Sequence, residues 1–181
     1  MKRKLLVSAH LFLAAFFAPF LIVIATTGGL YLLGEKGTLR YTPIAHLEMQ
    51  TLENQKRPLP EHLTALLQQA GVDNYTVKDI KISGDTIISY PSSRDYYQFT
   101  MNTTGVEIAR VSPNFLASTV ALHKGHGPAL FIYFEKALAI ALLLIVLSGL
   151  WLGFQSPKLR KTMFMHFAAG AVVFVLLAYV L

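Results

Sequence analysis

Three long runs of apolar residues dominate the hydropathy pattern of this chain. Residues 5–34, 137–154 and 162–181 contain no Asp, Glu, Lys or Arg. A bilayer core of about 30 Å is crossed by about 20 apolar helical residues, so each run predicts one transmembrane helix. The first run is too long for a signal peptide, whose apolar core has about 7 to 15 residues. We therefore expect three membrane spans.

The segment between the first two runs, residues 35–136, has a different pattern. One stretch has apolar positions at helical spacing, and four others alternate apolar and polar residues as half-buried strands do. We expect a helix at 58–70 and strands at 75–82, 86–90, 96–101 and 106–111. The predicted fold class is a membrane protein with three transmembrane α-helices and a small α+β domain inserted between helices 1 and 2.

Charge sets the expected orientation of the spans. The formal net charge is +6, but the ten acidic and ten basic residues of 35–136 cancel. The whole excess lies in residues 1–4 and in the loop 155–161, which three spans place on the same side of the membrane. Basic residues favour the cytoplasmic ends of spans, so both segments are predicted to be cytoplasmic. In a bacterial inner membrane, the domain at 35–136 and the C-terminus then face the periplasm.

Several kinds of chemistry are absent from the sequence. It has no cysteine, no glycine-rich phosphate loop and no HExxH zinc motif, so we predict no catalytic side chain. The basic clusters flank membrane spans, and attraction to anionic lipid heads explains them better than nucleic acid does. The lipid bilayer is therefore an expected partner, and nucleic acid is not.

Two histidines lie inside predicted spans at matching depth. His10 follows Lys4 by six residues and His166 follows Lys161 by five, which places both rings roughly 8 Å inside the cytoplasmic end. Two neutral imidazoles are the axial ligand set of a b-type haem, so His10 and His166 are candidate haem-iron ligands. The alternative is that small neighbouring residues merely let helices pack, with each histidine hydrogen-bonded at an interface.

His123 and His126 are weaker candidates for cofactor binding. Their spacing of three can place both rings on one helical face, where they cannot occupy opposite axial positions of one haem. A second haem would need a ligand from another chain. The alternatives are a transient contact with iron or copper and a polar segment at the membrane surface.

The order of several short motifs resembles the PepSY-associated transmembrane (PepSY-TM) family. The motifs are the basic start and His of 4–10, Thr27-Gly28-Gly29-Leu30, Leu122-His123, the hairpin residues Tyr97-Gln98-Phe99 with Gly105 and Glu107-Ile108, and Leu147-Ser148-Gly149-Leu150-Trp151. The resemblance implies a bacterial inner-membrane protein with a PepSY-like periplasmic domain, often associated with iron uptake. Larger members are similar to haem-containing reductases that release iron from siderophores, with histidines of the spans as haem ligands. This chain departs from those members by having three predicted spans.

Two functions follow from the residues and the resemblance together. The first is electron transfer through haem b to a ferric siderophore, as a haem-dependent ferric-chelate reductase or a subunit of one. One haem near the cytoplasmic face leaves most of the membrane to cross, so this function calls for a homodimer or a partner membrane subunit. The second is a non-catalytic membrane module whose PepSY-like domain binds or regulates a periplasmic protein.

Overall fold

The computed structural model describes residues 3–48 and 59–180 and divides the chain into two compact units. The helical unit comprises residues 1–21 and 136–181, and the sheet unit comprises Ile22–Glu135. Both boundaries lie inside helices, so the two units share the first and fourth helices of the chain. Residue 58, where the sequence predicts the start of a helix, and the terminal residues 1, 2 and 181 lie outside the described residues.

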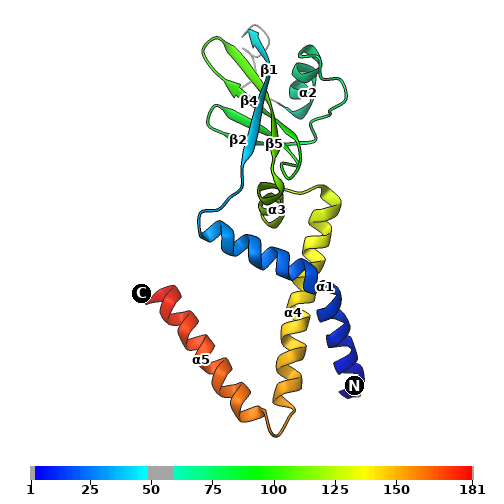
Figure 1. Cartoon of the computed structure of the whole chain (residues 1–181), viewed down its shortest axis with the longest axis vertical. Helices are drawn as coiled ribbons and strands as arrows, with labels where there is room; N and C mark the ends of the chain where they lie inside the picture. The colour runs from blue at the N-terminus through cyan, green and yellow to red at the C-terminus, as the bar shows by residue number, and fades with distance from the viewer. Residues whose placement is uncertain (1–2, 49–58, 181) are drawn as a thin grey trace. The chain divides into compact units, whose positions relative to one another are not determined.

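Three helices have the length and composition to cross a membrane: α1 (Arg3–Leu32), α4 (Ala129–Phe154) and α5 (Arg160–Tyr179) (Figure 1). The second charge-free run predicts a start at residue 137, whereas α4 begins at Ala129. The amide of Ile132 donates to the carbonyl of Pro128, so the backbone is already helical before the apolar run begins. Charged residues end the apolar run but do not prevent helical hydrogen bonding. The run is therefore shorter than the helix that contains it.

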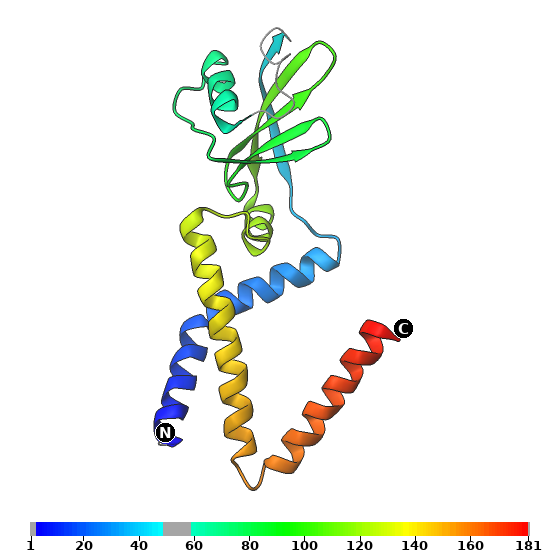
Figure 2. The same cartoon turned by 180° about the vertical axis from the view of Figure 1, so that it is seen from behind.

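In chain order, five strands lie between α1 and α4 and form one antiparallel sheet with the order β1-β5-β4-β3-β2 (Figure 2). Three of the four predicted strands are close to their expected positions, while the strand expected from residue 75 begins at 79. The strands are β1 (Leu39–Glu48), β2 (Asp79–Ser83), β3 (Thr86–Tyr90), β4 (Tyr96–Met101) and β5 (Gly105–Pro113).

The sequence pattern missed β1, which pairs along one side with β5. Its first five residues are exposed, and Pro43 interrupts the alternation of apolar and polar residues that begins with Leu39-Arg40-Tyr41-Thr42. Pro43 lies where the register shifts, between Pro43 and Ala45. A proline is tolerated there because an edge strand has one side without ladder partners. The interrupted pattern was overlooked, and pairing with β5 establishes this segment as a strand.

The core of the sheet unit lies between the sheet and α2 (Pro60–Gln69). The predicted apolar stripe of this helix is confirmed: Leu63, Leu66 and Leu67 are all buried. They pack with sheet residues that include Phe99 and Ile108, both at most 1% exposed. Fully burying each such side chain contributes about 1.5–3 kcal/mol to stability, so this cluster gives the sheet unit a hydrophobic core of its own.

A short helix that the sequence analysis did not predict, α3 (Phe115–His123), follows β5. The side chain of Asn114 caps it by accepting the amide hydrogen of Ala117 at 2.9 Å. Gly37 approaches the same turn so closely that a Cβ added there would lie 2.3 Å from the backbone nitrogen of Ala117. The hydroxyl of Ser118 also donates to the carbonyl of Ser93. These contacts hold α3 against the sheet.

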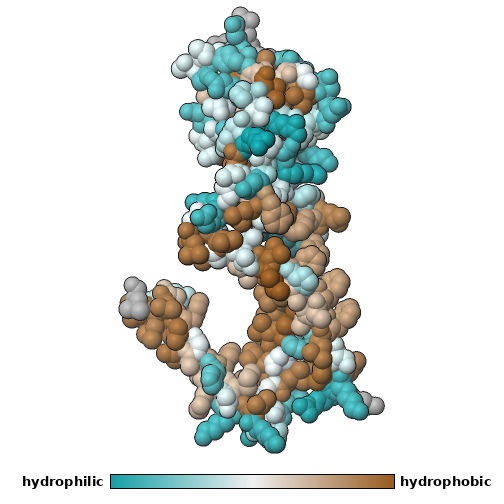
Figure 3. All heavy atoms as spheres, viewed as in Figure 1, coloured by the Kyte–Doolittle hydropathy of each residue, from teal (hydrophilic) through white to brown (hydrophobic). Residues whose placement is uncertain are grey.

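The surfaces of the two units differ in polarity. Apolar residues cover α4 and α5, while hydrophilic residues predominate around the sheet (Figure 3). None of the residues of α5 is buried, and Phe174 and Leu177 are more than half exposed. Exposing so much continuous apolar surface to water is unfavourable, whereas contact of the same surface with lipid is favourable. The three helices are therefore suited to a lipid bilayer, and the sheet to an aqueous surface.

Candidate functional site

His10 joins two candidate spans of the helical unit. Its Nδ1 lies 2.8 Å from Oγ of Ser148, which belongs to α4. The Ser148 hydroxyl lies 2.6 Å from the carbonyl oxygen of Leu144 and 3.1 Å from that of Ile145. Both carbonyls belong to the same helix, as is common for a serine inside a helix. The bond with His10 crosses from one helix to another, as the packing alternative to haem binding expects, although Ser148 was not predicted as the partner.

These partners determine which nitrogen of His10 carries the proton. A carbonyl oxygen can only accept, so the single hydroxyl hydrogen of Ser148 points toward Leu144. The Ser148 oxygen then accepts from His10, and Nδ1 must carry the hydrogen. In the neutral ring Nε2 is left with its lone pair free. Nε2 is the atom with which a histidine held in this way binds a metal.

Gly149 provides space beside the His10 ring. A Cβ added to Gly149 would lie 3.4 Å from Cε1 of His10, at the close end of van der Waals contact. Ser148 therefore offers a hydrogen-bond acceptor to the His10 imidazole, and Gly149, which has no side chain, leaves space beside the same ring. This Ser-Gly pair is the signal in the sequence that points to a helix-helix contact at this position.

His166 lies on α5, exposed, with a different partner. Its Nδ1 lies 2.8 Å from the carbonyl oxygen of Thr162, one turn earlier in the same helix. Because a carbonyl only accepts, Nδ1 again carries the hydrogen and Nε2 is the nitrogen with the free lone pair. Gly170, one turn further along, has open space around its Cβ position. His166 therefore has the same tautomer as His10 without a partner from another helix.

The hydrogen bonds of His10 and His166 lead to different helices. His10 pairs with α4, whereas His166 is bonded within α5. The contact between α4 and α5 is made by other residues, including the rings of Phe154 and Phe167, whose centroids are 6.4 Å apart. Among the described residues no hydrogen bond occupies Nε2 of either ring. The two rings have the same tautomer, with the hydrogen on Nδ1, but their hydrogen-bond partners lie on different helices.

His123 and His126 also have separate surroundings, both within the sheet unit. His123 ends α3, and its Cε1 would lie 3.4 Å from a Cβ added to Gly28 of α1. His126 lies beside Tyr90, with ring centroids 5.0 Å apart, and its carbonyl accepts the amide hydrogen of Ser92. The structure gives these two histidines different neighbours.

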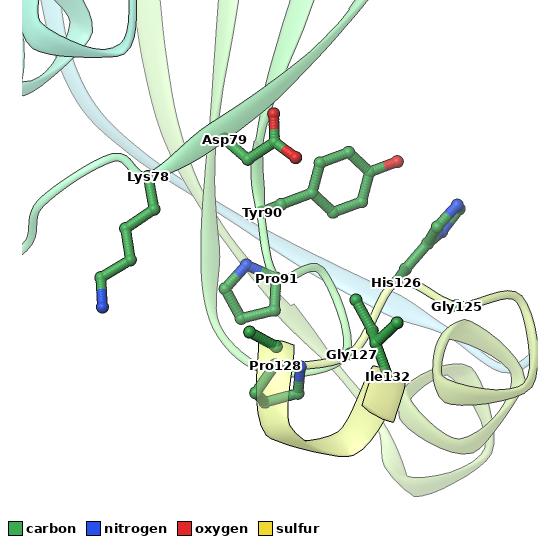
Figure 4. Close-up of a pocket in the computed structure, with 10 residues that line it drawn as sticks. Lys78, Asp79, Tyr90, Pro91, Gly125, His126, Gly127, Pro128 and Ile132 are labelled. Carbon is green, nitrogen blue, oxygen red and sulfur yellow. The ribbon is translucent and has the colours of Figure 1, made fainter. Parts of the chain in front are cut away.

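His126 borders a cavity of about 320 Å³ that the sequence analysis did not anticipate. Figure 4 shows the ring of Tyr90 between Asp79 and His126, with Lys78 pointing away from them (Figure 4). Burial, with smaller contributions from Lys81 and Lys124, lowers the pKa of His126 below its usual value. This ring is therefore neutral over more of the pH range than a free histidine.

No group of three or more His, Cys, Asp or Glu side chains that could hold a metal ion occurs in residues 3–48 and 59–180. A bis-imidazole haem requires only two protein ligands and does not depend on such a cluster. The candidate ligand atoms for haem iron are therefore imidazole nitrogens.

The fold and the site together define a membrane protein with three candidate spans and an antiparallel sheet domain. Residues 36–181 match the family described as Putative PepSY_TM-like, which covers more than half of the chain. The chain belongs to this PepSY-TM family, and the resemblance expected from the short motifs is confirmed. The match includes Ser148 and His166, while α1 with His10 precedes it.

No curated protein and no solved structure matches the chain.

Proposed function

We propose that this chain is a membrane electron-transfer protein that holds a b haem with His10 and His166. When bound, such a haem accepts and releases one electron at its iron. The observation that carries the proposal is the state of the two imidazoles. Each has its Nδ1 hydrogen held by an oxygen 2.8 Å away, and each leaves Nε2 as an open donor.

An unpaired nitrogen is costly in the apolar part of a membrane. Transfer of a polar group into hydrocarbon without a hydrogen bond costs several kcal/mol. Neither Nε2 is sealed inside the chain, because no buried side-chain nitrogen or oxygen among the described residues lacks a partner. A group from outside the chain is therefore needed to satisfy both nitrogens, and a metal that accepts imidazole meets that need.

The donor chemistry of both residues fits haem iron, and the exposure of α5 is compatible with it. His166 and the apolar residues around it are uncovered in the single chain. A haem plane, or a second copy of the chain, would cover them. The homodimer or partner subunit expected from the sequence belongs to this proposal for the same reason.

We further propose the bacterial inner membrane as the location, with the N-terminus cytoplasmic and the C-terminus periplasmic. The support is the position of the excess basic residues at 1–4 and 155–161. Since the chain has no cysteine, Thr103→Cys and Gln155→Cys provide single labels on exposed residues. A membrane-impermeant maleimide should label Thr103→Cys in spheroplasts, and Gln155→Cys only after permeabilisation. The reverse pattern would invert the topology.

The wider function that we propose is transfer of electrons to a ferric siderophore during iron acquisition, as a ferric-chelate reductase or a subunit of one. Its support is membership of the PepSY-TM family together with the two open imidazoles.

The test is the absorption spectrum of the full chain purified from haem-replete cells. We expect a Soret band that is lost in His10→Ala and in His166→Ala. His46→Ala is the matched control, because His46 is an exposed residue of β1 far along the sequence from both spans, and it should retain the band. Monodispersity and circular dichroism establish that each variant is folded. A colourless, folded wild-type protein would refute the haem proposal.

A second candidate function is a non-catalytic membrane module whose sheet binds or regulates a periplasmic protein. The observation that favours it is β1, an edge strand with five consecutive exposed residues and, among the described residues, a ladder partner on one side only. Edge strands are sites where a partner can add a strand. The haem spectrum separates the two functions, because this module needs no haem and the electron-transfer protein does.

A further inference from the structure

Two lysine side chains of the sheet unit converge on one tyrosine ring near the end of α1. Nζ of Lys124, the residue after α3, lies 4.0 Å from the centroid of the Tyr31 ring. Nζ of Lys36 lies 5.3 Å from the same centroid. A cation is attracted to the face of an aromatic ring, but the ring carries no net charge. Two positive charges are thus brought together around a neutral group.

Neither ammonium group forms an ion pair within the part of the chain that the structure describes. Among residues 3–48 and 59–180, no carboxylate oxygen lies within 4.0 Å of Lys36 or Lys124. An exposed ion pair of that kind does occur on the sheet, between Arg110 and Asp95. Both ammonium groups therefore lie close enough to the ring for one anion beside it to interact with both positive charges. The pair of lysines is therefore a candidate anion site.

A cavity of about 350 Å³ is lined by Lys124 and by Tyr31, whose ring Lys36 also approaches. Its walls come from the end of α1 and from α3 with the residue that follows it. The lining residues are Thr27, Gly28, Tyr31, Leu32, Val120, His123 and Lys124.

His123 adds a third group that can donate to an anion in this cavity. Its Cε1 and Nε2 atoms would lie 3.4 and 3.8 Å from a Cβ added to Gly28. A larger residue at position 28 would crowd this ring. The glycine of the Thr27-Gly28-Gly29 cluster therefore preserves access to His123.

The apolar surroundings indicate the kind of anion. The cavity borders the end of a candidate span, where Leu32 is 86% and Leu33 is 81% exposed. A free inorganic anion gains nothing from contact with this apolar surface, whereas the acyl chain of a lipid can pack against it. Basic pockets beside transmembrane helices are suited to lipid head groups.

We propose that this cavity binds an anionic phospholipid. Lys36 and Lys124 pair with its phosphate, His123 donates to the same head group, and the acyl chain lies along Leu32 and Leu33. This site is independent of haem, because its residues differ from His10, Ser148 and His166.

The test is native mass spectrometry of the full chain in detergent with equal amounts of phosphatidylglycerol and phosphatidylcholine. We expect preferential retention of phosphatidylglycerol, and a loss of at least tenfold in its affinity in the Lys36→Gln/Lys124→Gln double variant. The charge-matched control is Lys78→Gln/Lys81→Gln, which removes two lysines at β2 and should bind as the wild type does. Thermal melts establish that both double variants are folded.

Three results would overturn the proposal. The first is equal retention of the two lipids. The second is an equal loss in the control variant, which would indicate a general effect of charge. The third is displacement of phosphatidylglycerol by millimolar inorganic phosphate, which would assign the cavity to the free ion. As a further check, Leu32→Ser/Leu33→Ser should weaken binding of long-chain phosphatidylglycerol more than that of the dihexanoyl form.

Discussion

The two units of this protein are held together by different interactions. The sheet unit has a buried cluster in which α2 packs on the sheet through Leu63, Leu67 and Phe99. The helical unit exposes most of its apolar side chains, and a hydrogen bond between His10 and Ser148 joins two of its helices. The sheet unit is therefore stabilised by its own core, whereas the helices depend on lipid and on a few polar contacts.

A substitution in the core of the sheet unit should lower the stability of the protein most. Phe99 is 0% exposed, so Phe99→Ala should lower the free energy of unfolding by about 3–5 kcal/mol. Leu147 of α4 is 53% exposed, and Leu147→Ala should change it by no more than about 0.5 kcal/mol. Thermal melts followed by near-ultraviolet circular dichroism measure both. Similar losses in the two variants would remove the distinction between the units.

The next effect concerns the attachment of α3 to the sheet unit. Gly37 has φ +75° and lies against the backbone of Ala117, whereas Gly34 has φ +91° and open space. Gly34→Ala should cost about 1–2 kcal/mol for the left-handed conformation alone. Gly37→Ala should cost more, because the backbone of α3 must also shift. Equal melting temperatures for the two variants would mean that the close approach has no energetic role.

The polar contact of the helical unit is tested by Ser148→Ala. Without the Ser148 oxygen, the His10 ring is free to exchange its proton between nitrogens. Nitrogen-15 spectra of the haem-free protein should show Nδ1–H at His10 in the wild type and in Ser148→Thr, and a mixture of tautomers in Ser148→Ala. Removing the hydrogen-bond partner of a ligating histidine typically lowers metal affinity 10–100-fold. We expect Ser148→Ala to lower the affinity for haem by a factor in that range.

Ser8→Ala is the matched control for that experiment, because Ser8 is an exposed serine two residues before His10. Unchanged His10 spectra in Ser148→Ala would contradict the assigned hydrogen bond, whether or not the protein binds haem. A changed tautomer without any haem binding would preserve the hydrogen bond and refute the proposed function.

The smallest effect is a pH dependence of the sheet unit. Burial lowers the pKa of His126 below its ordinary value of 6.5, so the unfolded chain binds more protons between the two pKa values. The corresponding stability is present above about pH 6.5 and is lost as the pH falls through the folded pKa. The melting temperature of His126→Gln should decrease less between pH 7.5 and 5.0 than that of the wild type. His46→Gln, at an exposed position, should behave as the wild type does.

Local signals account for the elements that the sequence predicted correctly. The charge-free runs of the spans, the stripe of Leu63, Leu66 and Leu67, and the alternation in β4 all reflect burial within one element. The elements that were missed have weaker local signals. β1 exists because β5 offers a ladder, and α3 begins at an Asn114 cap that is difficult to distinguish from a loop asparagine.

The candidate site divides in the same way. The four histidines and their neighbouring small residues were identified from the sequence, since unusual residues in apolar runs are visible there. The partners of the histidines were not, because Ser148 is 138 positions from His10. The cavity beside Tyr90 and His126 was missed for the same reason, since it joins segments that are distant in the sequence.

The sequence by itself determined that this is a membrane protein with three apolar spans, a small mixed domain and two histidines within spans, because these properties depend on composition and local spacing. The tertiary structure alone decided that Ser148 holds Nδ1 of His10 and that Lys36 and Lys124 meet at Tyr31. Hydrogen bonds and charge contacts act over a few ångströms. Which side chains come within that range depends on how the helices and strands pack.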